Sequence, residues 1–125
     1  MKKVISTENA PKAVGPYSQA IEANGFIYIS GQVPLVPATG QIVEGGIEEQ
    51  TVQVMENIKA ILEAAGLTFD NVVKTTCLLS DIGNFQIMNG IYAKYFTENP
   101  PARAAYEVAK LPLGVMVEIE TIAVR

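Results

Sequence analysis

The 125-residue sequence contains no histidine. Histidine is the usual general base near neutral pH and a frequent metal ligand. Its absence excludes Ser-His-Asp triads, Cys-His nucleophiles and most zinc or iron sites. Any chemistry must therefore use arginine, carboxylates, hydroxyls, an amide or backbone groups.

Cysteine and basic residues are also scarce. The one cysteine, Cys77, lies in the apolar run from Val72 to Leu79, which favours a buried small side chain over a reactive thiol. Nine Lys and Arg against thirteen Asp and Glu give a net charge of −4. No nucleic-acid partner is expected, because binding a phosphate backbone requires a basic patch. An anionic metabolite is compatible with this charge if one arginine lies near it.

No stretch of the sequence approaches the length of a membrane span. The start, Met1 to Glu8, is positively charged but lacks the apolar stretch of a signal peptide. We therefore expect a cytoplasmic protein with no membrane partner. The length suits a single domain, residues 1–125, and the hydrophobic content of 49% suggests that a subunit interface covers part of the apolar surface.

Hydrophobic periodicity predicts strands and two helices in the order ββαβαββ. Asn24-Gly25 indicates a hairpin turn, Gly66 ends the first helix, and Asp81 or Asn84 can begin the second. This pattern is typical of an α+β fold with both helices on one face of a mixed sheet. The predicted strands are 17–23, 26–30, 72–80, 102–108 and 115–124. The first predicted helix runs from Ile47 to Ala65, and the second runs from its cap at Asp81 or Asn84 to about Thr97.

The last predicted strand has two different faces, because alternate side chains of a strand point in opposite directions. The set suited to lie under the helices is Val115, Val117, Ile119, Thr121 and Ala123. The other set is half apolar, and we expect a partner to cover it: Met116, Glu118, Glu120, Ile122 and Val124.

A hairpin between the last two strands would bring opposite charges together. If Val108 lies near Val115, Arg103 falls opposite Glu120 and diagonal to Glu118 on the same face. One interpretation is a cross-strand ion pair with no further role. The other is that Arg103 offers its planar fork to a ligand carboxylate, a geometry that lysine cannot match.

Three further polar residues stand out by position. Asn89 lies on the predicted inner face of the second helix, where a buried amide must find a partner in a backbone loop or a ligand. Tyr17 follows Gly15-Pro16 and Ser30 precedes Gly31, so both hydroxyls lie at strand ends where a ligand can approach the backbone closely. Taken singly, a residue in either position is more often an ordinary turn or core residue.

Six short motifs occur together in an order and spacing that resemble the reactive intermediate deaminase family (Rid, or YjgF-type) over nearly the whole chain. They are Gly15-Pro16-Tyr17-Ser18-Gln19, Ser30-Gly31-Gln32-Val33-Pro34, Ala64-Ala65-Gly66, Pro101-Ala102-Arg103, Leu111-Pro112 and Val117-Glu118-Ile119-Glu120.

The resemblance implies a chorismate-mutase-like α+β subunit that forms a homotrimer, with three clefts between subunits and no cofactor or metal. It also implies the hydrolysis of 2-imino acids to 2-oxo acids and ammonia. These imino acids form by tautomerisation of the enamines that pyridoxal-phosphate dehydratases release. The expected small-molecule partner is thus a 2-imino or 2-oxo carboxylic acid.

Matched position by position, the resemblance implies that Arg103 binds the substrate carboxylate and that Glu118 positions water, as the two catalytic residues. The implied substrate-binding residues are Tyr17, Ser30, Gly31, Asn89 and Ala105. Ala105 is a departure, because many deaminating members resemble Pro-Ala-Arg-Ser-Cys, with a pocket cysteine where this chain has alanine. Only the backbone N–H and C=O of Ala105 remain available there.

Two other functions are compatible with the same residues. A non-catalytic metabolite-binding or regulatory trimer could use the arginine cleft without turnover, because a fold does not by itself define a function. Ribonuclease or translation-inhibitor activity, which is attached to some relatives, is disfavoured by the acidic charge. Ammonia release from a freshly generated imine distinguishes a deaminase from a binding or regulatory trimer. Salt-dependent RNA binding would reveal the ribonuclease or translation-inhibitor activity.

Overall fold

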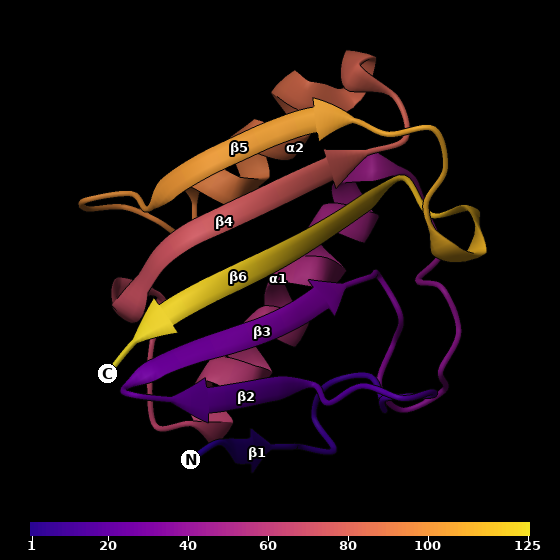
Figure 1. Ribbon diagram of the computed structural model, residues 1–125. Helices are drawn as coiled ribbons and strands as arrows, with labels where there is room; N and C mark the ends of the chain where they lie inside the picture. Colours follow the sequence, from indigo (N-terminus) through magenta and orange to yellow (C-terminus); the bar gives the residue numbers. More distant parts are fainter.

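The computed structural model describes residues 1–125 and contains one six-stranded sheet with two helices on one face (Figure 1). The strands lie in the order β1-β2-β3-β6-β4-β5, with β4 and β5 parallel and all other neighbours antiparallel. The predicted α+β fold with a mixed sheet is therefore confirmed. The elements are β1 (Lys3–Ile5), β2 (Ala20–Ala23), β3 (Phe26–Gln32), α1 (Ile47–Ala64), β4 (Val72–Leu79), α2 (Phe85–Ala93), β5 (Ala102–Glu107) and β6 (Val117–Val124).

Helix α1 begins at the predicted Ile47 and ends at Ala64, one residue before the predicted end. At its start the Glu49 side chain accepts a hydrogen bond from the Gly46 backbone N–H at 2.8 Å. At its end Gly66 adopts a φ of +76°, and the Leu67 N–H reaches back to the Leu62 carbonyl at 2.8 Å. This left-handed C-terminal turn is one that glycine adopts without steric cost. Neither helix combines the length and apolar character needed to cross a membrane.

Helix α2 is shorter than expected and ends at Ala93. Asp81 caps a preceding 3₁₀ turn, Ile82–Asn84, by accepting the Gly83 N–H at 2.8 Å, and α2 follows directly from this turn. After Ala93 the backbone tightens into single turns, with the Tyr95 N–H bonded to the Tyr92 carbonyl. The apolar stripe that predicted a longer helix continues through these turns.

The β2–β3 hairpin turns at Asn24 and Gly25, both with positive φ, as predicted. Strand β2 starts only at Ala20, and β1 was not predicted because three residues are too few to show a period. The N-terminal segment is held by Gln19, which is 4% exposed. Its side-chain amide donates to the carbonyls of three residues of this segment: Thr7, Ala10 and Pro11.

The predicted hairpin between the last two strands is wrong. Strand β6 lies between β3 and β4, and β5 is an edge strand paired in parallel with β4. Arg103 lies beside Thr75, whereas Glu120 pairs with Thr76 and points to the opposite face. The physical reason is burial, because β6 buries alternate side chains almost completely, as a central strand does, while β5 stays largely accessible.

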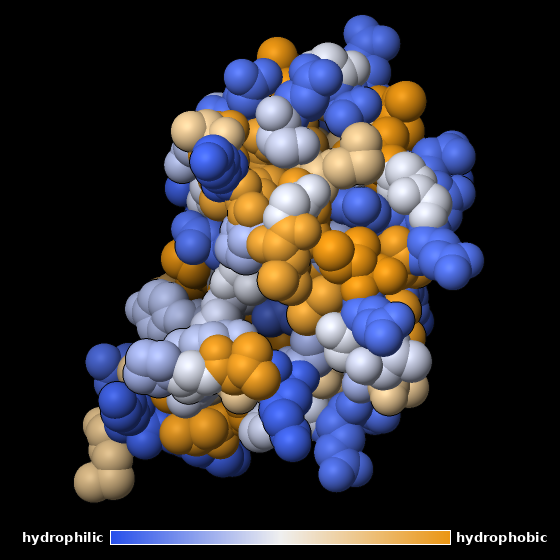
Figure 2. Space-filling view, turned by 90° about the vertical axis from the view of Figure 1, so that its right-hand side faces the viewer, coloured by the Kyte–Doolittle hydropathy of each residue, from blue (hydrophilic) through white to orange (hydrophobic).

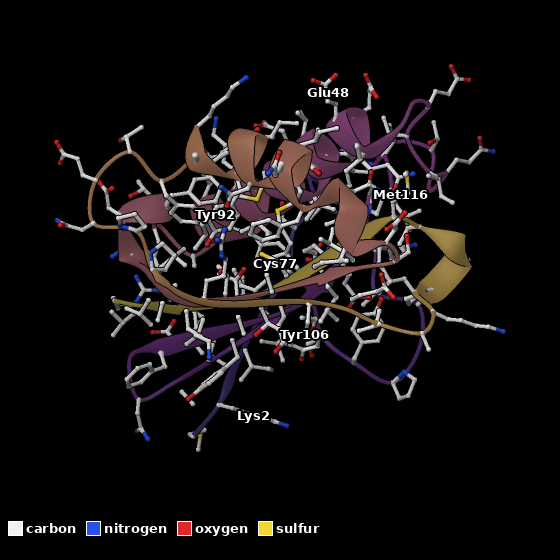
Figure 3. The ribbon with its side chains drawn as sticks, turned by 90° about the horizontal axis from the view of Figure 1, so that it is seen from above. Lys2, Glu48, Cys77, Tyr92, Tyr106 and Met116 are labelled. Carbon is white, nitrogen blue, oxygen red and sulfur yellow. The ribbon has the colours of Figure 1, made fainter.

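The hydrophobic core lies between the helices and the sheet. The inner set predicted for the last strand is buried, with Val117, Ile119 and Ala123 at 0% exposure. Figure 3 shows Cys77 and Tyr92 in this layer and Tyr106 on the other side of the sheet. That open face carries exposed aromatic side chains, including Tyr28 and Tyr106, so its partly apolar character is as expected.

The buried position of Cys77 leads to a chemical prediction. Burial raises the pKa of its thiol to about 11, so little thiolate is present near pH 8. We expect the native protein to react with a disulfide reagent at pH 8 at least about 10²-fold more slowly than the chain unfolded in guanidinium. Native labelling as fast as that of the unfolded chain would contradict the core position of Cys77.

Candidate functional site

Arg103, the second residue of β5, lies under one face of helix α2. Its Nη1 donates a hydrogen bond to Asn89 Oδ1 at 2.6 Å. Its Cζ lies 5.4 Å from the ring centroid of Phe85 and 4.9 Å from that of Tyr92, within the range of cation–π attraction. Phe85, Asn89 and Tyr92 share one helix face because they are spaced by four and three residues. One face of α2 thus holds a single guanidinium group.

Asn89 therefore has a side-chain partner, not a backbone loop. From the sequence alone, either a backbone loop or a ligand could be the partner of this amide, and in the structure its oxygen accepts a hydrogen bond from Arg103. The contact of Phe85 and Tyr92 with the arginine is not predicted from the sequence. The available signal was two aromatic residues flanking an amide at helical spacing, but the sequence did not show what they face.

Arg103 forms no ion pair. The other arginine, Arg125, forms the one ion pair of the chain, a double contact with the two carboxylate oxygens of Glu22 at 3.0 Å each. The hypothesis of a cross-strand ion pair between Arg103 and Glu120 is therefore wrong. Nε and Nη2 of Arg103 make no hydrogen bond within the subunit. The guanidinium keeps its positive charge and two donor groups for a ligand.

Two concave surfaces border the guanidinium. A pocket of about 350 Å³ is lined by Asn89, Tyr92, Ala93, Phe96, Pro100, Pro101 and Arg103. Further along β5, on the same face of the strand as Arg103, a depression of about 510 Å³ is lined by Ile82, Gly83, Phe85, Gln86 and Ala105. Because Ala105 has only a methyl group, it leaves this second surface open beside the arginine.

The other predicted residues form a second group where β3 and β6 meet. The Ser30 hydroxyl donates to the Ser18 carbonyl at 2.6 Å, and the Ser30 N–H donates to the Gln19 carbonyl at 2.9 Å. These bonds hold the segment after Tyr17 against β3, while the Tyr17 side chain itself is 52% exposed. Next to Ser30, Gly31 lies directly against the side chain of Glu118. A Cβ atom at Gly31 would overlap Glu118 Oε2 and lie 2.9 Å from its Cδ.

The environment of Glu118 favours its protonated form. Partial burial raises the pKa of its carboxyl group, and the nearby negative charge of Glu120 raises it further. A carboxylate with a raised pKa is a better proton acceptor near neutral pH than an ordinary one. No cluster of three or more His, Cys, Asp or Glu side chains in the chain could hold a metal ion.

The two groups cannot act on one small molecule within a single subunit. Arg103 points to the helix-covered face of the sheet, and Glu118 points to the open face. By register the two residues are three positions apart along the strands and two strands apart, about 10 Å in each direction. Figure 2 faces the end of the molecule where β3 ends and β6 begins, and hydrophobic side chains reach the surface there among polar ones.

Comparison with known proteins gives a consistent result for both sequence and fold. The model of the family described as Endoribonuclease L-PSP matches residues 7–125. A mouse protein named 2-iminobutanoate/2-iminopropanoate deaminase is 56% identical over 125 residues, which cover 100% of this chain and 93% of that protein.

Two solved structures are closely similar. The structure of a conserved Rid family protein from Yersinia pestis has a TM-score of 0.98 at 53% identity and covers 100% of both chains. The structure of Escherichia coli TdcF with bound serine has a TM-score of 0.94 at 39% identity and covers 98% of both chains. These matches define an α+β protein built on the fold of the Rid structures. The chain belongs to the Rid/YjgF/L-PSP family.

The contact between Gly31 and Glu118 can be tested without an activity assay. Gly31→Ala should displace the Glu118 side chain, because the added methyl group occupies the space of its carboxylate. We expect a lower melting temperature and a changed chemical shift for the carboxyl carbon of Glu118. Gly90→Ala is the matched control, since nothing lies within 4 Å of the added methyl group in helix α2. An unchanged Glu118 signal in Gly31→Ala would contradict the contact.

Proposed function

We propose that this protein is a 2-iminobutanoate/2-iminopropanoate deaminase. It hydrolyses 2-imino acids, tautomers of enamines such as 2-aminoacrylate and 2-aminocrotonate, to 2-oxo acids and ammonia. The name of the mouse relative supports this activity. The observation that carries it is the Arg103 guanidinium, which neutral groups orient and no carboxylate neutralises. A group of this kind suits the carboxylate that all these substrates share.

Arg103 binds the substrate carboxylate through Nε and Nη2, the donors that have no partner within the subunit. Asn89 holds Nη1 and lines the same pocket. Ala105 borders the depression further along β5. The bound serine of E. coli TdcF supports a ligand of this class, because serine carries a carboxylate and a nitrogen on the same carbon, as a 2-imino acid does.

A second subunit completes the cleft. Glu118 lies on the opposite face of the sheet from Arg103, with Gly31 directly against it. The substrate therefore meets these two residues, Ser30 beside them and the Tyr17 segment that Ser30 holds only if they come from a neighbouring copy. The partly apolar open face gives a surface for that contact. The assembly is a homotrimer of chorismate-mutase-like subunits with three clefts, in which residues 1–125 form one Rid domain.

The reaction requires no histidine, metal or cofactor. A protonated imine is already electrophilic at C2, so the site has to orient it and supply water. Glu118 holds the water molecule and accepts one of its protons as the oxygen bonds to C2. That proton then passes to the nitrogen. As the C–N bond breaks, Glu118 takes the remaining hydroxyl proton, the C2 carbonyl forms, and ammonia leaves the 2-oxo acid. Such general base catalysis contributes roughly 10²- to 10⁴-fold.

The remaining groups shape the pocket. Tyr17 covers the substrate side chain, and its hydroxyl is an alternative donor to the departing nitrogen. Ser30 fixes the segment that carries Tyr17 through its bond to the Ser18 carbonyl. The alanine at position 105 is compatible with the mechanism, because no covalent intermediate with the protein forms and no thiol is required.

The competing function is a metabolite-binding or regulatory trimer that uses the same cleft without turnover. Ammonia release from 2-iminobutanoate, generated in the assay by a threonine dehydratase, distinguishes the two functions. We expect release faster than spontaneous hydrolysis. Binding of 2-oxobutanoate with no acceleration of ammonia release would support the regulatory function instead.

Replacing Arg103 by lysine tests the carboxylate clamp. Arg103→Lys keeps the charge but loses the planar fork, so imine hydrolysis should fall by about 10²-fold or more while the fold is retained. Arg125→Lys is the matched control, because Arg125 is paired with Glu22 outside the proposed cleft, and its turnover should stay within a few-fold of wild type. Wild-type turnover in Arg103→Lys would show that another group binds the carboxylate.

Mixing two inactive variants tests whether the cleft lies between subunits. Glu118→Gln removes the base and should bind 2-oxobutanoate without turnover. When Arg103→Lys and Glu118→Gln subunits are co-expressed in equal amounts and assemble at random, about a quarter of all clefts combine an intact Arg103 with an intact Glu118. Activity should therefore reappear, and light scattering should report three times 13.4 kDa. A monomer, or a mixture that stays inactive, would contradict the shared cleft.

A further inference from the structure

A buried hydrogen bond lies under the Arg103 guanidinium and connects helix α2 to the sheet. The Tyr92 hydroxyl and Thr75 Oγ1 are 2.7 Å apart, and Thr75 is 1% exposed. Thr75 is also the β4 residue that pairs with Arg103 in the parallel ladder. Figure 3 shows Tyr92 between helix α2 and the sheet. Thr75 thus pairs with the backbone of Arg103 and also holds the Tyr92 ring, over which the Arg103 side chain lies.

We infer that Tyr92, held by Thr75, is a positioning residue that sets the orientation of the Arg103 guanidinium for binding a carboxylate. The inference rests on the proposed function and extends it to one residue of the pocket wall, Tyr92, and one residue buried behind it, Thr75. Neither Tyr92 nor Thr75 needs to touch the substrate, because both act through Arg103.

The contacts of Arg103 explain why a second restraint is needed. The bond to Asn89 fixes Nη1 only, and a single hydrogen bond leaves the group free to rotate about it. A ring at 4.9 Å restricts the position of the guanidinium, but only if the ring itself is fixed. Phe85, whose ring centroid lies 5.4 Å from the same guanidinium, has no polar atom with which to anchor its ring. The hydroxyl of Tyr92 provides that anchor on β4, and burial raises the pKa of this hydroxyl, so it stays protonated.

The test measures affinity for 2-oxobutanoate by calorimetry, beside kcat and KM for 2-iminobutanoate. Tyr92→Phe and Thr75→Val each remove one partner of the bond and keep the shape of the side chain. Each should weaken 2-oxobutanoate binding and raise KM by about three- to tenfold, with kcat changed less than about twofold. Tyr92→Leu also removes the ring and should weaken binding further.

Tyr95→Phe is the matched control. Tyr95 lies just after α2, and its hydroxyl donates to Glu56 at 2.8 Å, so the same substitution removes a tyrosine hydrogen bond that does not involve Thr75 or Arg103. We expect its affinity and KM to equal those of the wild type. The double variant Tyr92→Phe with Thr75→Val should bind no more weakly than either single variant, because both remove the same interaction.

The outcomes separate this inference from the proposed function. If the two variants only lower the melting temperature, with affinity and KM unchanged, the bond is purely structural and the inference is wrong. Fully additive losses in the double variant would also overturn it. If the variants weaken 2-oxobutanoate binding but wild-type protein releases no ammonia, the proposed deaminase activity fails and the positioning role stands. Wild-type protein that does not bind 2-oxobutanoate would overturn both.

Discussion

The alternation of side chains across the sheet governs how the functional groups of this protein can be used. In the row that crosses β5, β4 and β6, Arg103, Thr75 and Thr121 all point to the helix-covered face. Glu118 is three positions before Thr121 on β6, an odd number, so it points to the open face. No rotamer change moves a side chain through a sheet. The arginine and the glutamate of one chain therefore stay apart, and a site that uses both must be built by association.

Local signals in the sequence were sufficient for most elements of the fold. Asn24-Gly25 fixed the hairpin and Gly66 fixed the end of α1, because both positions require a backbone conformation that few residues adopt. The alternation in β6 fixed which side chains enter the core. The pairing of β5 could not be read in this way. Its residues are mostly small or charged, and the loop at Leu111 to Gly114 is equally compatible with a hairpin or with a crossing to the centre of the sheet.

The candidate site shows the same division between local and long-range information. Helical spacing placed Phe85, Asn89 and Tyr92 on one face, but what that face meets depends on the parallel pairing of β4 with β5. The resemblance to a family implied that Arg103 and Glu118 are the catalytic residues, but it did not show how they lie relative to each other. The contact between Gly31 and Glu118 was also invisible in the sequence, because the two residues meet only when β3 and β6 are neighbours.

The two arginines of the chain show how neighbouring groups determine whether a charge is available. Glu22 neutralises Arg125 through two hydrogen bonds, whereas an amide oxygen and two aromatic rings orient Arg103 without neutralising it. A carboxylate beside Arg103 would compete with an anionic ligand for the same donors, and neutral groups do not. In the proposed trimer a second subunit covers this guanidinium, and burying an unpaired charge is unfavourable. A bound carboxylate removes that penalty, so ligand binding and subunit association stabilise each other.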